Sequence, residues 1–287
     1  MEEIMVPAEK VVYGPDGCDL KKAQTILRQN KVKFLPIIDK KGSLRSLICK
    51  KDLMSSQEYP LATIDNNNQL MVGASITTRN PLTRTRALVN AGVDVIVIES
   101  SRGASKYQVD TIKLLKEKFP DLPIIGGNVV TSRQARVLIE AGVDGIRVGC
   151  GIGSICTTQN QIGVGRPQAS AVYHVANFVY QYCQDRPKMS KIPVIADGSI
   201  ATGAHIVRAL AIGADTVMMG SLLAGANESP GDVFMENGVA LKNYRGMGSL
   251  AAMRAGRTTE RYLMNEKKIT VSALKYASTA SPTNFSI

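Results

Sequence analysis

The sequence predicts an α/β protein, a TIM (β/α)8-type barrel in which six βα strands are recognisable. Short apolar segments alternate with amphipathic stretches from residue 70 onwards, which is the pattern of a parallel sheet covered by helices. Three apolar segments are entered through one repeated step, Ala91–Asp94, Ala141–Asp144 and Ile212–Asp215, with a glycine where a helix would end. Polar residues follow successive strands, as on the catalytic face of a barrel. A doubly wound sheet is the alternative.

The first part of the chain has a different organisation. Its predicted elements are a helix, a strand, a turn and a second strand, over residues 19–29, 33–38, 39–42 and 44–49. The second strand is followed by Lys51-Asp52-Leu53, a close that resembles that of a CBS motif. CBS motifs normally pair to form a nucleotide-binding cleft, and one motif is visible here. A β-hairpin with a helix, a common small unit, is the alternative interpretation.

These patterns divide the chain into two expected domains, a partial CBS domain over residues 1–60 and a barrel portion over residues 61–287. The strands of the barrel portion are predicted at residues 70–76, 94–98, 123–127, 145–149, 193–196 and 216–220. A sheet of this kind has two edges that a closed barrel would pair.

The composition places the chain among globular proteins, because 287 residues with 44% hydrophobic and 21% charged can bury a full core. No run approaches about eighteen apolar residues and the N-terminus is acidic, so we expect a cytoplasmic protein without a membrane span. The five cysteines and two histidines are too scattered for a zinc site or a disulfide framework. The net charge of +11 comes without a long basic run and with only 5% aromatics, which argues against nucleic acid and leaves an anionic small substrate or a solvated surface.

The segment Gly149–Thr158 places a cysteine in a glycine-rich turn directly after an apolar strand. Glycines let the backbone approach a ligand closely, and the amides of such a loop can hold an anion beside the thiol. A thiolate at this position can attack an electrophilic carbon. Cys156 alone could equally be a small buried hydrophobic residue, and Cys150 lacks supporting neighbours.

Further polar segments follow the other predicted strands. They are Glu99–Gly103, Gly127–Asn128, Asp197–Ser199 and Gly220–Ser221. Because the carboxyl ends of parallel strands meet at one face of a barrel, we expect these segments to converge there with the cysteine loop. The last two follow the final strands, where barrels commonly bind phosphate through backbone amides, although Ser199 and Ser221 also suit ordinary turns. His174 and His205 lie in helical stretches and are interpreted as surface or packing residues.

Five motifs together resemble the IMP dehydrogenase family. They are Gly151–Thr158, Gly165–Gln168, Ile195–Gly198, Met218–Ser221 and Tyr244–Ser249, in the family's order and spacing, within a match from residue 10 to residue 272. The resemblance implies an oxidoreductase of GMP biosynthesis that oxidises IMP to XMP with NAD and uses a potassium ion. It also implies a homotetramer of TIM barrels that carry a CBS insertion.

The resemblance assigns roles to residues at matching positions. Cys156 would attack C2 of the purine beside Thr158, and Arg261 and Tyr262 would activate the water that hydrolyses the covalent intermediate. The substrate-binding residues would be Ser154, Asp197, Gly198, Ser199, Gly220, Ser221, Tyr244, Met247 and Gly248. Among these, Asp197 would bind the ribose diol. The residues at the NAD site would be Glu99, Ser100, Ser101, Asn128 and Arg147. The main-chain oxygens that contribute to a potassium site would be those of Gly151, Gly153 and Cys156.

Several positions depart from the family's pattern. Glu99 stands where the family usually has Asp, and the extra methylene moves the carboxylate that would bind the NAD ribose. Ser199 replaces a glycine. Arg261 and Tyr262 could also be an exposed pair on a helix, and Glu99 a carboxylate that faces water. The family's first two βα units and its usual C-terminal stretch have no counterpart in the sequence, so we hypothesise a truncated or misassembled gene product.

Three functions remain open from the sequence. The first is IMP dehydrogenase, with missing parts that lower activity or come from another chain. The second is GMP reductase, a related enzyme that converts GMP to IMP with NADPH on a similar loop. Thr157 and Gly163–Gly165 favour the reductase. The dehydrogenase is favoured by Arg166, Tyr244–Gly248, the pair at residues 261–262 and the CBS-like segment. The third is an inactive nucleotide-binding or subunit-interaction protein.

Overall fold

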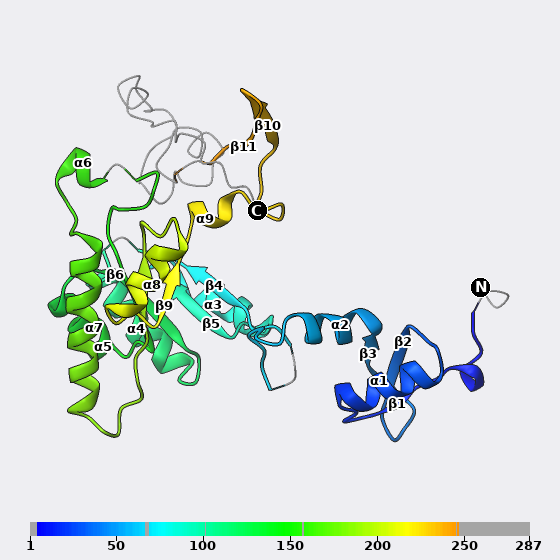
Figure 1. The fold of residues 1–287 in the computed structure, drawn as a ribbon. Coiled ribbons are helices and arrows are strands. Elements are labelled where there is room, and N and C mark those ends of the chain that lie inside the picture. The colour runs from blue at the N-terminus through cyan, green and yellow to red at the C-terminus, as the bar shows by residue number, and fades with distance from the viewer. Residues whose placement is uncertain (1–4, 67–68, 101, 157, 245, 247–287) are drawn as a thin grey trace. The chain divides into compact units, whose positions relative to one another are not determined.

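The computed structural model describes residues 5–66, 69–100, 102–156, 158–244 and 246 of the chain (Figure 1). The chain forms two compact units, Met1–Met71 and Val72–Ile287. Among the described residues, no helix has both the length and the apolar character that crossing a membrane requires.

The first unit is a small sheet with two α-helices. Its elements are a 3-10 helix (Ala8–Lys10), β1 (Gly14–Pro15), α1 (Leu20–Gln29), β2 (Phe34–Ile38), β3 (Leu44–Cys49) and α2 (Lys50–Glu58). β1 pairs with β2 in parallel, and β2 pairs with β3 in antiparallel register. Asp39 closes the hairpin, since its Oδ1 accepts hydrogen bonds from the amides of Lys41 (2.8 Å) and Ser43 (2.9 Å). The predicted helix, turn and two strands are confirmed, while the assignment to a CBS domain stays a prediction.

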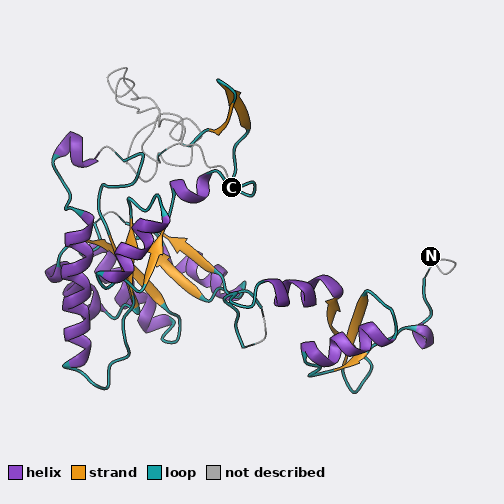
Figure 2. Ribbon diagram, in the orientation of Figure 1, coloured by secondary structure: helices purple, strands orange, loops and turns teal. Residues whose placement is uncertain are grey.

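The second unit contains a sheet of six parallel strands flanked by helices (Figure 2). The strands of this sheet are β4 (Gly73–Ile76), β5 (Val95–Ile98), β6 (Ile124–Val129), β7 (Gly145–Val148), β8 (Val194–Asp197) and β9 (Thr216–Met218). The helices are α3 (Pro81–Asn90), α4 (Lys106–Lys118), α5 (Ser132–Ala141), α6 (Thr158–Ile162), α7 (Gln168–Gln184), α8 (Gly203–Ala211) and α9 (Ser221–Ala224). A hairpin that the sequence did not predict, β10 (Val233–Glu236) and β11 (Val239–Lys242), follows them.

The strand order of the sheet is the order of the sequence, β4-β5-β6-β7-β8-β9. A doubly wound sheet reverses its order at a switch point, so this order selects the TIM-like arrangement over the alternative. All six predicted strands are confirmed, as a half-barrel whose carboxyl ends share one face.

The repeated glycine-aspartate step explains how each helix returns to the sheet. The glycines adopt left-handed backbone angles just past the helix ends, with φ of +86° at Gly92, +103° at Gly142 and +107° at Gly213. The aspartates then reach the neighbouring strand. Asp144 Oδ2 accepts the Ile124 amide at 2.7 Å, and Asp94 and Asp215 make the same bond to the amides of residues 72 and 194 at 2.7 and 2.8 Å. The step therefore ends a helix and satisfies the first amide of an adjacent strand.

Branched apolar side chains fill the space between the sheet and the outer helices. Ile96, Ile124 and Ile146 of three adjacent strands are fully buried against Ile112 and Leu138 of the helices. Helices cover the face of the sheet that carries these side chains, and a shift of a strand by one residue would move them off that face. The core therefore fixes the strand register and with it the positions of the strand ends.

Candidate active site

The segments that follow the strands converge at the carboxyl ends of β5 to β8, as the sequence predicts. Asn128 links three of them. Its backbone amide donates to the Ser100 carbonyl at 2.7 Å, and its carbonyl accepts the Gly103 amide at 2.9 Å. Its side-chain Nδ2 donates to the Gly149 carbonyl (2.7 Å) and to Asp197 Oδ2 (2.9 Å). The loop after β5 and the ends of β7 and β8 are thereby tied to one residue.

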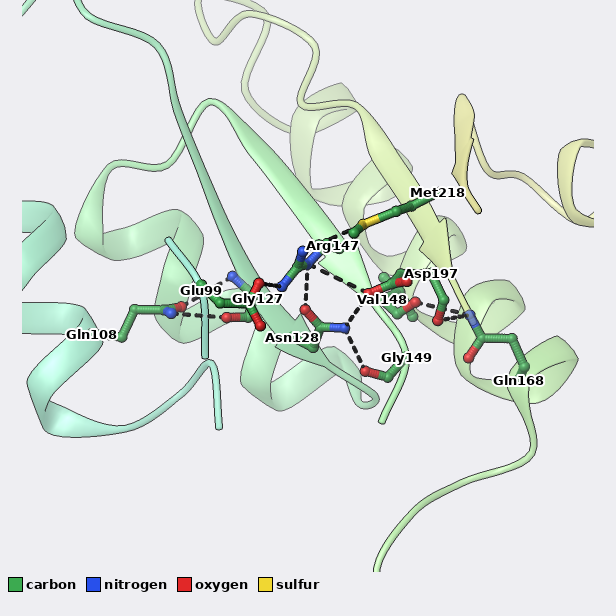
Figure 3. A network of polar contacts seen from close by, with 10 residues as sticks. All are labelled: Glu99, Gln108, Gly127, Asn128, Arg147, Val148, Gly149, Gln168, Asp197 and Met218. Atoms are coloured by element: carbon green, nitrogen blue, oxygen red, sulfur yellow. Dashed lines mark hydrogen bonds and ion pairs between the residues drawn. The ribbon is translucent and has the colours of Figure 1, made fainter. Parts of the chain in front are cut away.

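Arg147 lies at the centre of these contacts (Figure 3). Its Nη2 donates to Glu99 Oε2 at 2.6 Å, and its Nε donates to Asn128 Oδ1 at 2.5 Å. The same Nε lies 3.6 Å from Asp197 Oδ2, and Nη1 lies 3.3 Å from the sulfur of Met218. The Arg147 side chain is 6% exposed, against 30% for Glu99 and 24% for Asp197. One buried guanidinium thus faces two partly exposed carboxylates.

The cysteine loop leaves β7 directly beside β8. Gly149 has φ of +145°, and a Cβ built on it would collide with the Asp197 main-chain carbonyl. This close approach requires glycine. The neighbouring Gln168, the first residue of α7, donates its Nε2 to the carbonyls of Val148 (2.8 Å) and Asp197 (3.1 Å), which holds the two strand ends together.

Cys156 is exposed, and its Sγ lies 3.1 Å from Thr158 Oγ1. The loop keeps this geometry through main-chain contacts. The Cys156 amide donates to the Gly153 carbonyl at 2.8 Å, and Gln159 Nε2 donates to the Cys150 carbonyl at 2.7 Å. The loop therefore presents a thiol with a hydroxyl beside it, an arrangement suited to nucleophilic attack followed by reaction with water.

The two cysteines of the loop differ in environment. Burial raises the pKa of the Cys150 thiol above its ordinary value, and nearby Cys156 adds to this effect, while Arg102 opposes it. At neutral pH the Cys150 thiol is therefore less ionised than an ordinary cysteine, and so less nucleophilic. The exposed Cys156 is the better candidate.

Of the segments predicted to bind phosphate, Asp197–Ser199 borders the cysteine loop. Ser199 has φ of +58° and donates its hydroxyl to the Ile152 carbonyl at 2.8 Å. A Cβ on Gly198, where φ is +110°, would lie 2.7 Å from the Ile152 side chain. On the next strand, a Cβ on Gly220 would lie 2.5 Å from the Tyr244 hydroxyl. Glycine at these two positions therefore lets the Ile152 side chain and the Tyr244 hydroxyl approach the backbone closely.

Two further predicted residues of this set differ in exposure. Ser154 is exposed on the cysteine loop, while Ser221 is 6% exposed at the start of α9. Residues 101, 247, 248, 261 and 262 lie outside the described part, so the predicted roles of Ser101, Met247, Gly248, Arg261 and Tyr262 stay predictions.

The sequence assigned no role to three residues that organise the site, Gln108, Gln168 and Met218, although the last two lie in motifs named above. Gln108 is fully buried on α4 and makes two hydrogen bonds to Gly127. Its Nε2 donates to the Gly127 carbonyl at 2.8 Å, and its Oε1 accepts the Gly127 backbone amide at 3.0 Å. A polar residue on the apolar face of a helix was the signal that could have found it. Gln168 lies within the motif Gly165–Gln168, but its partners Val148 and Asp197 are 20 and 29 positions away in the sequence.

The chain belongs to the IMP dehydrogenase/GMP reductase family. The family's domain model matches residues 19–276. An inosine-5′-monophosphate dehydrogenase from Toxoplasma gondii is 50% identical over 257 residues, which are 89% of this chain and 45% of that protein. The corresponding dehydrogenase from Aquifex aeolicus is 44% identical over 88% of this chain and 50% of its own length. The chain thus spans about half the length of the curated relatives it matches.

A solved structure supports the same fold. A crystal structure of a cysteine-to-alanine GMP reductase variant from Trypanosoma brucei, in complex with guanosine 5′-monophosphate, aligns with a TM-score of 0.80 at 32% identity. It covers 92% of this chain and 54% of the other. The half-barrel is therefore shared with a nucleotide-binding member of the family.

Proposed function

We propose that this chain carries the catalytic centre of an IMP dehydrogenase, which oxidises IMP to XMP with NAD through a covalent bond to Cys156. The observation that carries the proposal is the exposed Cys156 thiol, 3.1 Å from the Thr158 hydroxyl, in a loop that Gly198 borders through Ile152. The names of the curated relatives favour the dehydrogenase reaction.

In the proposed reaction the Cys156 thiolate forms an Sγ–C2 bond to the electron-poor purine carbon that lies between two ring nitrogens. NAD, when bound, would accept the hydride that leaves C2. The remaining thioimidate is hydrolysed as water adds to C2 and the thiolate leaves, so that XMP keeps the water oxygen. The Thr158 hydroxyl, 3.1 Å from the Cys156 sulfur, would hold that water, and the pair Arg261 and Tyr262 would supply the base.

Nucleotide binding would use the segments around the loop. The backbones of Gly198 and Gly220 would approach the 5′-phosphate with Ser154, Ser199, Ser221 and Tyr244 around it. Asp197 would accept hydrogen bonds from the ribose diol, because its carboxylate is partly exposed beside Gly149. The net charge of +11 favours attraction of an anionic substrate.

At the predicted cofactor position, the Glu99 side chain fits the ribose of a dinucleotide. Glu99 presents a 30% exposed carboxylate, and a carboxylate can accept both hydroxyls of a ribose. For potassium, the candidate oxygens are the main-chain carbonyls of Gly151, Gly153 and Cys156, and carbonyl oxygens are the usual ligands of this ion. They would form part of a coordination shell, whose remaining oxygens would come from elsewhere in a proposed tetramer.

GMP reductase is the second candidate, because a GMP-bound reductase shares the fold at a TM-score of 0.80. The same thiol would attack C2 of GMP, with ammonia leaving and NADPH supplying the hydride. The two reactions differ in substrate and in the direction of hydride transfer, so they can be separated directly.

The test incubates the purified full chain with IMP and NAD and follows NADH by its absorbance. We expect NADH formation that Cys156→Ala abolishes and that Cys183→Ala, a change at the C-terminal end of α7, leaves intact. Oxidation of NADPH with GMP instead would favour the reductase. NADH formation by Cys156→Ala would contradict the covalent mechanism, and nucleotide binding without turnover would favour a non-catalytic binding protein.

A further inference from the structure

The polar network around Arg147 joins two carboxylates to which the proposed function gives different ligands. Glu99 belongs to the predicted cofactor side, at the end of β5, and Asp197 to the predicted ribose side, at the end of β8. Arg147 bonds Glu99 directly and reaches Asp197 both at 3.6 Å and through Asn128. The network therefore runs across the strand ends from one predicted subsite to the other (Figure 3).

The position of Arg147 is fixed by its surroundings. A Cβ built on the adjacent Gly127 would lie 2.6 Å from the Arg147 carbonyl and 2.8 Å from its Cβ, so the two strands touch at this point. Gln108, fully buried, holds the Gly127 amide and carbonyl at 3.0 and 2.8 Å. The backbone that precedes Asn128 is thus locked against β7, and the guanidinium cannot shift without breaking several contacts.

The burial and bonding of Arg147 indicate its role. With 6% of its side chain exposed, and with Nε, Nη1 and Nη2 each directed at a protein atom, the guanidinium offers little surface to a ligand. The two carboxylates that it faces are the more exposed groups. A planar guanidinium can hold two such partners in fixed directions, which a lysine ammonium cannot do.

We infer that Arg147 is a positioning residue that couples the cofactor subsite to the nucleotide subsite, by orienting Glu99 and Asp197 through one guanidinium and Asn128. The assignment of ligands to the two carboxylates rests on the proposed function, whereas the coupling itself is a property of the network. A change at Glu99 is then transmitted to Asp197, and loss of Arg147 affects both subsites.

The first experiment measures the dissociation constant of IMP by calorimetry on the full chain, without dinucleotide. We expect Arg147→Met to weaken IMP binding at least about tenfold, because a carboxylate loses its charged partner, and Arg147→Lys to restore part of the loss. Arg136→Met is the control, since Arg136 lies over the Phe178 and Tyr182 rings, away from the network. An unchanged IMP constant in Arg147→Met, with only the KM for NAD raised, would overturn the inference, and so would an equal loss in the control.

The second experiment needs no ligand, so it still tests the coupling if the chain does not bind IMP and the proposed function fails. Unfolding equilibria are compared for Glu99→Gln, Asp197→Asn and the double variant, with Arg147 and with Arg147→Met. We expect the two changes to be non-additive by at least about threefold in the equilibrium constant with Arg147, and additive without it. Additivity in both backgrounds would overturn the inference.

Discussion

Gly149→Ala tests the close approach of the cysteine loop to β8. The new Cβ would collide with the Asp197 carbonyl and lie 3.1 Å from Gln168 Nε2, at a backbone φ of +145°. A side chain in this backbone region costs about 1 to 3 kcal/mol. Overpacking against a rigid strand end adds about 1 to 3 kcal/mol. The expected loss of unfolding free energy is therefore about 2 to 6 kcal/mol, a large share of a typical domain's stability.

The assay is urea unfolding of the full chain followed by far-UV circular dichroism. The matched control is Gly163→Ala, because Gly163 has φ of +64° but a Cβ there would have no atom within 4 Å. Its expected loss is only the backbone term of about 1 to 2 kcal/mol. If Gly149→Ala is destabilised no more than Gly163→Ala, the two strand ends do not approach as described and the argument fails.

Three further predictions concern the site. Because burial raises the pKa of Cys150, iodoacetamide should alkylate Cys150 more slowly than Cys156 at about pH 8, and the difference in rate should shrink as the pH rises. Peptide mass spectrometry measures both rates, and equal rates at all pH values would contradict the prediction. Gln108→Leu should lower the unfolding free energy by about 2 to 4 kcal/mol, because it removes the two buried hydrogen bonds to the amide and carbonyl of Gly127. A loss under about 0.5 kcal/mol in a urea titration would contradict this prediction. Thr158→Val should lower kcat at least about tenfold while Thr158→Ser retains most activity, and equal kcat values would remove Thr158 from the mechanism.

The fold could be predicted from the sequence because its signals are local. The glycine of each repeated step marks a helix end within a few residues, and Gly92, Gly142 and Gly213 all adopt the left-handed angles that such ends require. The role of the aspartates in these steps could not be predicted in this way. Asp144, for example, bonds the amide of Ile124, twenty positions earlier, and a repeat does not reveal such a partner.

The hairpin β10–β11 was missed although its signal is present. Asn237 and Gly238 connect the strands with φ of +52° and +79°, and Asn-Gly is the preferred pair for a two-residue hairpin turn. The exposed residues of β10 lack the alternation of apolar and polar side chains by which strands are recognised.

In the candidate site too, local contacts could be predicted from the sequence and contacts between distant residues could not. The proximity of Cys156 and Thr158 follows from their spacing in one loop, and the convergence of strand ends follows from the barrel. The network through Arg147 depends on contacts between residues 19 to 71 positions apart. Its signal in the sequence was a charged residue in the middle of the apolar strand Gly145–Val148, which is buried along its whole length.

The most direct test of the account is detection of the covalent intermediate. The full chain is mixed with IMP and NAD, quenched with acid and digested, and the peptide that contains Cys156 is examined by tandem mass spectrometry. The account predicts a purine nucleotide attached to the sulfur of Cys156, and no attachment in Cys156→Ala. NADH formation without any nucleotide on Cys156, or with the nucleotide on another residue, would contradict the assignment of Cys156 as the nucleophile.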